Sequence, residues 1–126
     1  MASHRRLPSR CSGRNASAVA KASRGYQTIG IVPAGEKWPD GSLRPALEDW
    51  LGAGAIISNL PGSWFPEATA AVSAFETQRT ELLQAMKTCP SGVELLDGGY
   101  DEDVELAGQL DSSTAVPQFD PPAYHG

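Results

Sequence analysis

Residues 29–60 constrain the fold more than any other part of the chain. They open with apolar, largely β-branched side chains, pass through a loop rich in proline and glycine, and end in an amphipathic helical pattern. This order predicts a strand, a tight loop and a helix, the unit from which open α/β sheets are built. Ligands of such sheets bind beyond the carboxyl ends of the strands. We therefore expect any chemistry of this chain in the loop, which carries Glu36, Lys37, Trp38 and Asp40.

The helix that ends this segment is predicted from its capping residues and from one apolar face. Asp40 or Ser42 can cap it, and Pro45 suits its first turn. The apolar face recurs at helical spacing and consists of Leu47, Trp50, Leu51, Gly54 and Ala55. Glycines inside a helix indicate either close packing against a neighbouring element or fraying, which would here begin after Leu51.

Periodicity and turn residues predict the elements on either side. A short helix is expected over residues 15–23, with Asn15 as its N-cap, and a strand over residues 26–32. The longest helix is expected over residues 66–88. A short helical piece at 93–97 and a last helix at 100–110 follow.

Charge is unevenly distributed along the 126 residues. The net charge is −5, yet most basic side chains precede Glu36, whereas all fifteen acidic ones lie from Glu36 onward. The acidic main body argues against a nucleic-acid partner. The basic leader at residues 1–13 is predicted to be disordered because it has little to bury, although a nucleic-acid-binding arm or a targeting peptide would have a similar composition.

Two further features bound the class of protein. No apolar run approaches the roughly 20 residues of a membrane-spanning helix, so no membrane partner is expected. Cys11 and Cys89 lie far apart and form no motif, for which reduced thiols in a cytoplasmic protein are the default. The folded part is expected at residues 14–116, and residues 117–126, with their prolines, are expected to form an extended tail.

One long stretch has a distinctive sequence, AGEKWPDGSLRPALED over residues 34–49, continued by LGAGAI over residues 51–56. Shorter matches lie at residues 14–20, 66–68, 91–92 and 103–104. Together these motifs resemble the C-terminal part of the 2-phosphosulfolactate phosphatase family. The resemblance covers residues 14–116, and the N-terminal part of the family domain has no counterpart here.

The resemblance implies a fold and an activity. The fold would be an α/β domain of three layers, α/β/α, of which this chain is expected to be an incomplete C-terminal portion. The activity would be magnesium-dependent removal of phosphate from a small anionic phospho-acid, in the manner of coenzyme M biosynthesis. Glu36 and Asp40 would then hold Mg²⁺ and act in catalysis, because Mg²⁺ prefers oxygen ligands.

Other residues of the same stretch would bind the substrate. Lys37 and Arg44 could face phosphate or sulfonate oxygens, and Ser42 would lie at a helix start, which favours anions. The structural alternative is that Asp40 caps the helix and Glu36 is solvated. Ser91 is a further candidate within a Ser-Gly-Val-Glu segment, in which Val93 stands where the family usually has arginine.

A second hypothesis is a truncated, non-catalytic remnant that acts at most as an oligomerisation or interaction module. It is favoured by the missing counterpart of the family's N-terminal part and by Val93. A single predicted strand cannot form a sheet by itself, so the chain is expected either to pair with another copy or to lack its partner strands. One-sided helices would then leave apolar faces uncovered, so the chain is expected either to self-associate, as in a homo-oligomer, or to form a loosely packed state.

Overall fold

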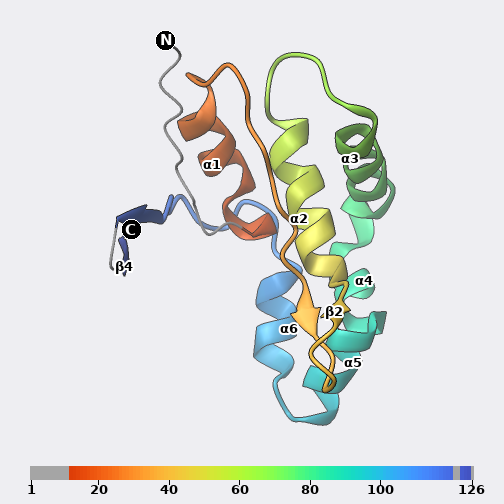
Figure 1. Cartoon of the computed structure of the whole chain (residues 1–126). Coiled ribbons are helices and arrows are strands. Elements are labelled where there is room, and N and C mark those ends of the chain that lie inside the picture. Colours follow the sequence, from red (N-terminus) through yellow and green to blue (C-terminus); the bar gives the residue numbers. More distant parts are fainter. Residues whose placement is uncertain (1–11, 121–122, 126) are drawn as a thin grey trace.

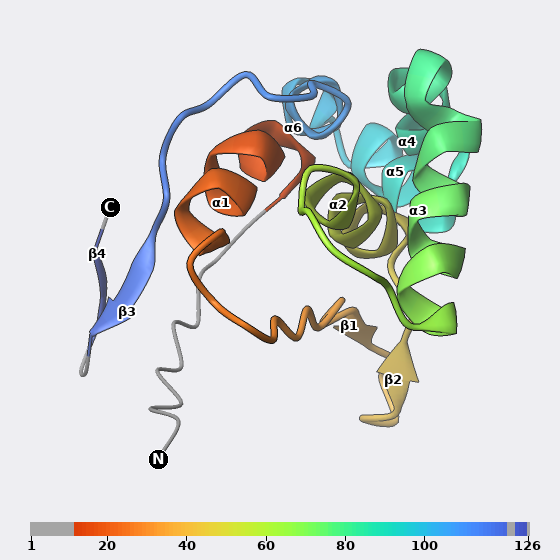
Figure 2. The ribbon, with the colours of Figure 1, turned by 90° about the horizontal axis from the view of Figure 1, so that it is seen from above.

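The computed structural model describes residues 12–120 and 123–125. Its central element is α2 (Leu47–Ser58), which lies between α1 (Ala16–Ser23) and α3 (Pro66–Gln78) (Figures 1 and 2). Every residue of α2 from Leu51 to Ile57 is buried. A helix that is apolar or small on all sides is expected to be enclosed by its neighbours, which explains this central position.

The contact between α2 and α3 depends on a small residue. A Cβ atom added at Gly54 would overlap the carbonyl of Ala71 and lie 2.7 Å from the Cβ of Phe75. The Phe75 ring is 2% exposed and joins the core formed with α1. The prediction that glycine in this helix marks close packing is therefore confirmed, and α2 continues through Ser58 without fraying. Trp50, predicted on the apolar face, is 48% exposed.

The predicted long helix over residues 66–88 is wrong in its continuity. A 3-10 turn, η2 (Arg79–Glu81), separates α3 from α4 (Leu82–Thr88). Beyond this turn, Met86 packs with Leu51 in a second core cluster. α5 (Pro90–Asp97) and α6 (Asp101–Ala107) follow and pack against α4 and each other. The short helix expected at residues 93–97 thus begins earlier, at a proline that suits a first helical turn.

The strand predicted at residues 26–32 is absent. The chain is irregular from residue 26 to 35, with Ile31 packed against the core and Val32 84% exposed. β-branched residues form a strand when cross-strand neighbours are available, and this segment pairs with no other described segment. The described strands form two antiparallel hairpins: β1 (Glu36–Lys37) with β2 (Leu43–Arg44), and β3 (Gln118–Asp120) with β4 (Ala123–His125).

The fold is therefore mixed α/β and mostly helical. The predicted three-layer α/β/α arrangement is not confirmed, because the sheets described are these two hairpins. None of the helices in the described ranges has the length and apolarity that crossing a membrane requires. Residues 1–11 of the predicted leader lie outside the described residues.

The segment after α6 returns to the start of α1. The Asp111 side chain accepts a hydrogen bond from the backbone N–H of Ser17 at 2.7 Å, and the Asn15 amide donates to the carbonyl of Ala115 at 2.9 Å. Asn15 occupies the predicted N-cap position, but its side-chain oxygen accepts from the N–H of Ser12. The first turn of α1 is therefore capped by Asp111, a residue that lies 94 positions away from Ser17 in the sequence.

Candidate active site

The loop predicted to join a strand to a helix is the β1–β2 hairpin. Its register pairs Glu36 with Arg44 and Lys37 with Leu43. The turn is closed by hydrogen bonds from the N–H of Trp38 to the carbonyl of Ser42, at 2.9 Å, and from Gly41 back to Trp38, at 2.8 Å. Gly41 has φ +85°, a left-handed conformation that glycine adopts without strain.

Asp40 and Ser42 lie together at the tip of this hairpin. Asp40 Oδ1 accepts hydrogen bonds from the Ser42 backbone N–H, at 2.9 Å, and from Ser42 Oγ, at 2.6 Å. The hydroxyl bond is the main reason that the pKa of Asp40 lies below its ordinary value. The prediction that either residue caps α2 is wrong: α2 begins at Leu47, with Ala46 in the cap position. Ser42 is therefore in a turn and not at a helix N-terminus.

Arg44 is held from three directions. Its Nη1 and Nη2 donate to the two carboxylate oxygens of Glu94 at 2.9 and 3.0 Å, and its Nε lies 3.6 Å from Glu36 Oε2. The guanidinium carbon lies 4.7 Å from the centre of the Trp38 ring. The hydrogen bonds to Glu94 raise the pKa of Arg44 and, in turn, those from Arg44 lower the pKa of Glu94. The guanidinium thus has a defined orientation between the hairpin and α5.

Ser91, at the start of α5, completes this group. It is 8% exposed, and its hydroxyl donates to Glu36 Oε2 at 3.3 Å. We call the set of Glu36, Trp38, Arg44, Ser91 and Glu94 the hairpin–α5 junction. The structure therefore brings together three of the residues predicted for the site, from two segments that are far apart in the sequence.

The remaining predicted residue, Lys37, is separated from this group. Neighbouring residues of a strand point to opposite faces, and Glu36 faces Arg44 across the hairpin. Lys37 therefore lies on the face opposite Arg44, together with Leu43. Its ammonium is exposed and makes no hydrogen bond or ion pair with any described residue. The predicted pair of cations is thus divided between the two faces of the hairpin.

Two carboxylates of the first turn of α2 were not singled out from the sequence. Asp49 Oδ2 accepts a hydrogen bond from the N–H of Gly35 at 2.7 Å, which ties the start of the hairpin to α2. Glu48 Oε2 is buried and has no hydrogen-bond partner among the residues that the structure describes. Burial raises the pKa of Glu48, and the negative charges of Asp49 and Glu36 act in the same direction. The sequence shows that residue 48 is acidic, but it does not show that the side chain is buried. Burial of Glu48 depends on the packing around α2.

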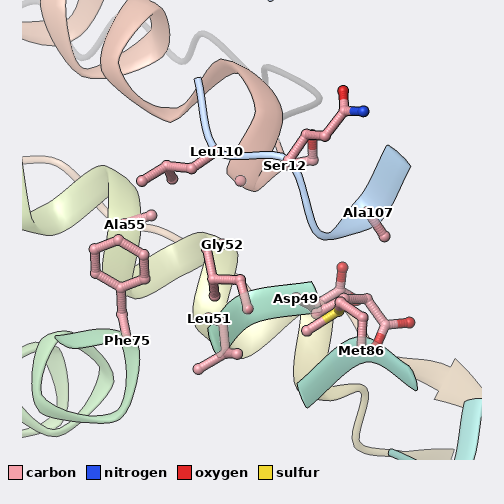
Figure 3. Close-up of a pocket in the computed structure, with 13 residues that line it drawn as sticks. Ser12, Asp49, Leu51, Gly52, Ala55, Phe75, Met86, Ala107 and Leu110 are labelled. Carbon is pink, nitrogen blue, oxygen red and sulfur yellow. The ribbon is translucent and has the colours of Figure 1, made fainter. Parts of the chain in front are cut away.

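A cavity of about 110 Å³ lies inside the helical part, beside these two carboxylates. Its walls come from α2, α3, α4 and the segment after α6, and they are mainly apolar, as Leu51, Phe75 and Leu110 show (Figure 3). A volume of this size admits a few water molecules. Within residues 12–120 and 123–125, no three histidine, cysteine, aspartate or glutamate side chains are placed so that they could hold a metal ion.

Comparison with known proteins identifies the family of this chain. No solved structure gives a significant match. A protein of Gloeobacter violaceus named probable 2-phosphosulfolactate phosphatase is 31% identical over 96 residues, which cover 76% of this chain and 39% of that relative. The chain thus matches about two fifths of the length of this relative. The model of the 2-phosphosulfolactate phosphatase family matches residues 9–121. The chain therefore belongs to the 2-phosphosulfolactate phosphatase family.

Proposed function

We propose that this chain acts in the magnesium-dependent hydrolysis of a small phosphate monoester, with 2-phosphosulfolactate as the first candidate substrate and sulfolactate and phosphate as products. The name of the relative supports this choice of substrate. The observation that carries the proposal is the hairpin–α5 junction, in which Glu36 and Ser91 lie beside one oriented guanidinium, that of Arg44. In a member of a phosphatase family, an oriented guanidinium of this kind is suited to bind a doubly charged oxyanion.

Arg44 is the residue proposed to hold the phosphoryl or sulfonate group. A guanidinium presents two parallel N–H donors, whose spacing matches two oxygens of a phosphate. Ser91 is nearly buried beside it and can turn its hydroxyl toward an oxygen of the substrate. Ser42, at the tip of the hairpin, could donate its hydroxyl proton to the substrate by turning away from Asp40. Lys37, on the opposite face, supplies positive charge that attracts an anionic substrate toward the hairpin.

Glu36 and Asp40 are the residues proposed to hold Mg²⁺. Their donor chemistry fits, because Mg²⁺ is commonly bound by one or two carboxylates together with water and substrate phosphate. Within the described part of the chain, one carboxylate oxygen of each, Glu36 Oε1 and Asp40 Oδ2, takes part in no hydrogen bond. When bound, the ion would neutralise charge on the phosphoryl oxygens and lower the pKa of a coordinated water.

The test is phosphate release from 2-phosphosulfolactate by the purified chain, with Mg²⁺ and with excess chelator. Glu36→Gln and Asp40→Asn are expected to weaken magnesium binding and turnover while the fold survives, since Asn keeps the oxygen that accepts from Ser42. Glu67→Gln, which changes an exposed carboxylate on α3, is the matched control. No magnesium-dependent release above background, or full magnesium affinity in both site variants, would contradict the proposal.

A second candidate function is a non-catalytic module that associates with a further copy of itself. The observation that favours it is the number of large apolar side chains on the surface, among them Val32 at 84%, Phe65 at 78% and Leu43 at 66% exposure. Sedimentation over a wide concentration range separates the two candidates. Concentration-dependent association without any phosphatase activity would support the module, whereas an active monomer would rule it out.

A further inference from the structure

The two ends of the Arg44–Glu94 pair differ in how firmly they are held. The Arg44 side chain is only 11% exposed and is fixed by the Trp38 ring and by Glu36 Oε2. The Glu94 side chain is 63% exposed and belongs to the outer face of α5. Its two oxygens bond to Arg44 at 2.9 and 3.0 Å. Glu94 can therefore leave by rotating its side chain, whereas the guanidinium stays in place.

The position of the Glu94 carboxylate is the position that an oxyanion ligand would take. A carboxylate that bonds side by side to a guanidinium uses the same two N–H donors as a phosphate does. Glu36 differs, because it approaches Nε from the side and is also tied to the nearly buried Ser91. The two Nη donors are thus covered by the more exposed of the two carboxylates.

We propose that Arg44 is an oxyanion site with a built-in competitor: Glu94 occupies the site in the free protein and leaves it when a phosphate-bearing ligand binds. This inference rests on the proposed function for its biological meaning, since it describes how the same site would be regulated. A ligand has to replace one full negative charge, so a doubly charged phosphate is favoured over singly charged anions such as acetate. The competitor thus sets both the affinity and the charge preference of the site.

Removing the charge of Glu94 should therefore tighten phosphate binding. The experiment is titration of the full chain with inorganic phosphate at low ionic strength, without Mg²⁺, followed by NMR or calorimetry. In Glu94→Gln the dissociation constant for phosphate is expected to fall about tenfold, because a like charge within a few ångströms of the ligand is removed. Glu94→Asp, which keeps the charge but draws it back by one methylene, is expected to give a smaller gain and provides a second variant if the first folds poorly.

The chain offers a matched control in Arg79 and Glu76. This pair also joins an arginine to a glutamate, at 3.3 Å, with the Arg79 guanidinium 5.7 Å from the Phe75 ring. Both side chains are exposed, at 55% and 46%, so the guanidinium is not pre-oriented. Glu76→Gln is expected to leave phosphate affinity unchanged. Adding Arg44→Lys to Glu94→Gln should cancel the gain, since lysine lacks the two-donor fork.

The outcomes separate this inference from the proposed function. Phosphate affinity that is equal in the wild type, Glu94→Gln and Glu94→Asp would overturn the claim that Glu94 competes with phosphate for Arg44. This holds even if magnesium-dependent hydrolysis is observed. An equal gain in Glu76→Gln would also overturn it, because the effect would then be one of net charge. Absence of hydrolysis together with a tenfold gain in Glu94→Gln would contradict the proposed reaction and leave the oxyanion site supported.

Discussion

The helical body around α2 and the hairpin–α5 junction are held together by different forces. The body is joined by apolar contacts, in which Phe75 and Val104 are almost completely buried. The junction is joined by ion pairs and hydrogen bonds around Arg44, with Glu94 largely open to water. Buried aromatic and aliphatic groups contribute kilocalories to stability, whereas exposed ion pairs contribute little. If the proposed site is correct, stability and ligand binding reside in separate parts of this chain, so mutations should affect one without the other.

The largest effect is expected where the body loses its central ring. Phe75→Ala should lower the free energy of unfolding by about 3–5 kcal/mol, because it removes buried apolar surface and leaves a cavity. Phe65→Ala, at a ring that is 78% exposed, should change it by less than about 0.5 kcal/mol. Urea unfolding of both variants measures the difference. Equal losses would show that the core is not where the structure places it.

A slightly smaller effect is expected from the close contact between α2 and α3. Gly54→Ala should cost about 2 kcal/mol or more, since the new methyl group overlaps the backbone of α3. Gly52→Ala adds the same group two residues away, where the nearest atom lies 3.4 Å off, and should be neutral or stabilising by up to about 1 kcal/mol. Thermal unfolding distinguishes the two. A tolerated Gly54→Ala would contradict the close contact between α2 and α3 on which the helical body depends.

The smallest effect is expected at Glu48, which lies between the two regions. Its pKa in the folded chain is raised above the ordinary value of 4.5, so the folded state holds this proton more tightly than the unfolded state does. Stability from this group is present below about pH 4.5 and is lost as the pH rises through the raised pKa. Glu48→Gln cannot titrate and should be the more stable chain at neutral pH, with little difference at pH 4. Chemical unfolding at several pH values measures this, and a gain that is independent of pH would contradict the assignment.

Several helices could be predicted from the sequence because their signals are local. Pro66 marks the start of α3 as expected, and the helix predicted at residues 15–23 closely matches α1. The glycines of this helix left two alternatives open, close packing or fraying, and the structure shows close packing at Gly54. The helix signals depend on residues within one or two turns of each other, whereas the partner of Gly54 lies on another helix.

The errors concern features that depend on partners far away in the sequence. The β-branched residues at 29–32 have strand propensity, but whether a strand forms depends on a neighbour to pair with. Asp40 looked like a helix cap because a helix follows, whereas it is the hairpin turn that uses its carboxylate. The hydrogen bonds from Arg44 to Glu94 join residues 50 positions apart in the sequence. No local pattern could therefore reveal that the guanidinium of the predicted substrate-binding arginine already binds a carboxylate.

The most direct test of the central claim is a map of where phosphate binds, made from backbone amide NMR shifts of the wild-type chain during titration with Mg²⁺ and inorganic phosphate. We expect the shifts to concentrate at the hairpin–α5 junction, at Glu36, Trp38, Arg44 and Ser91, while the amides of the helical body stay in place. Shifts that concentrate instead around the internal cavity, at Gly52 and Ala55, would contradict the claim that ligand binding and stability lie in separate regions.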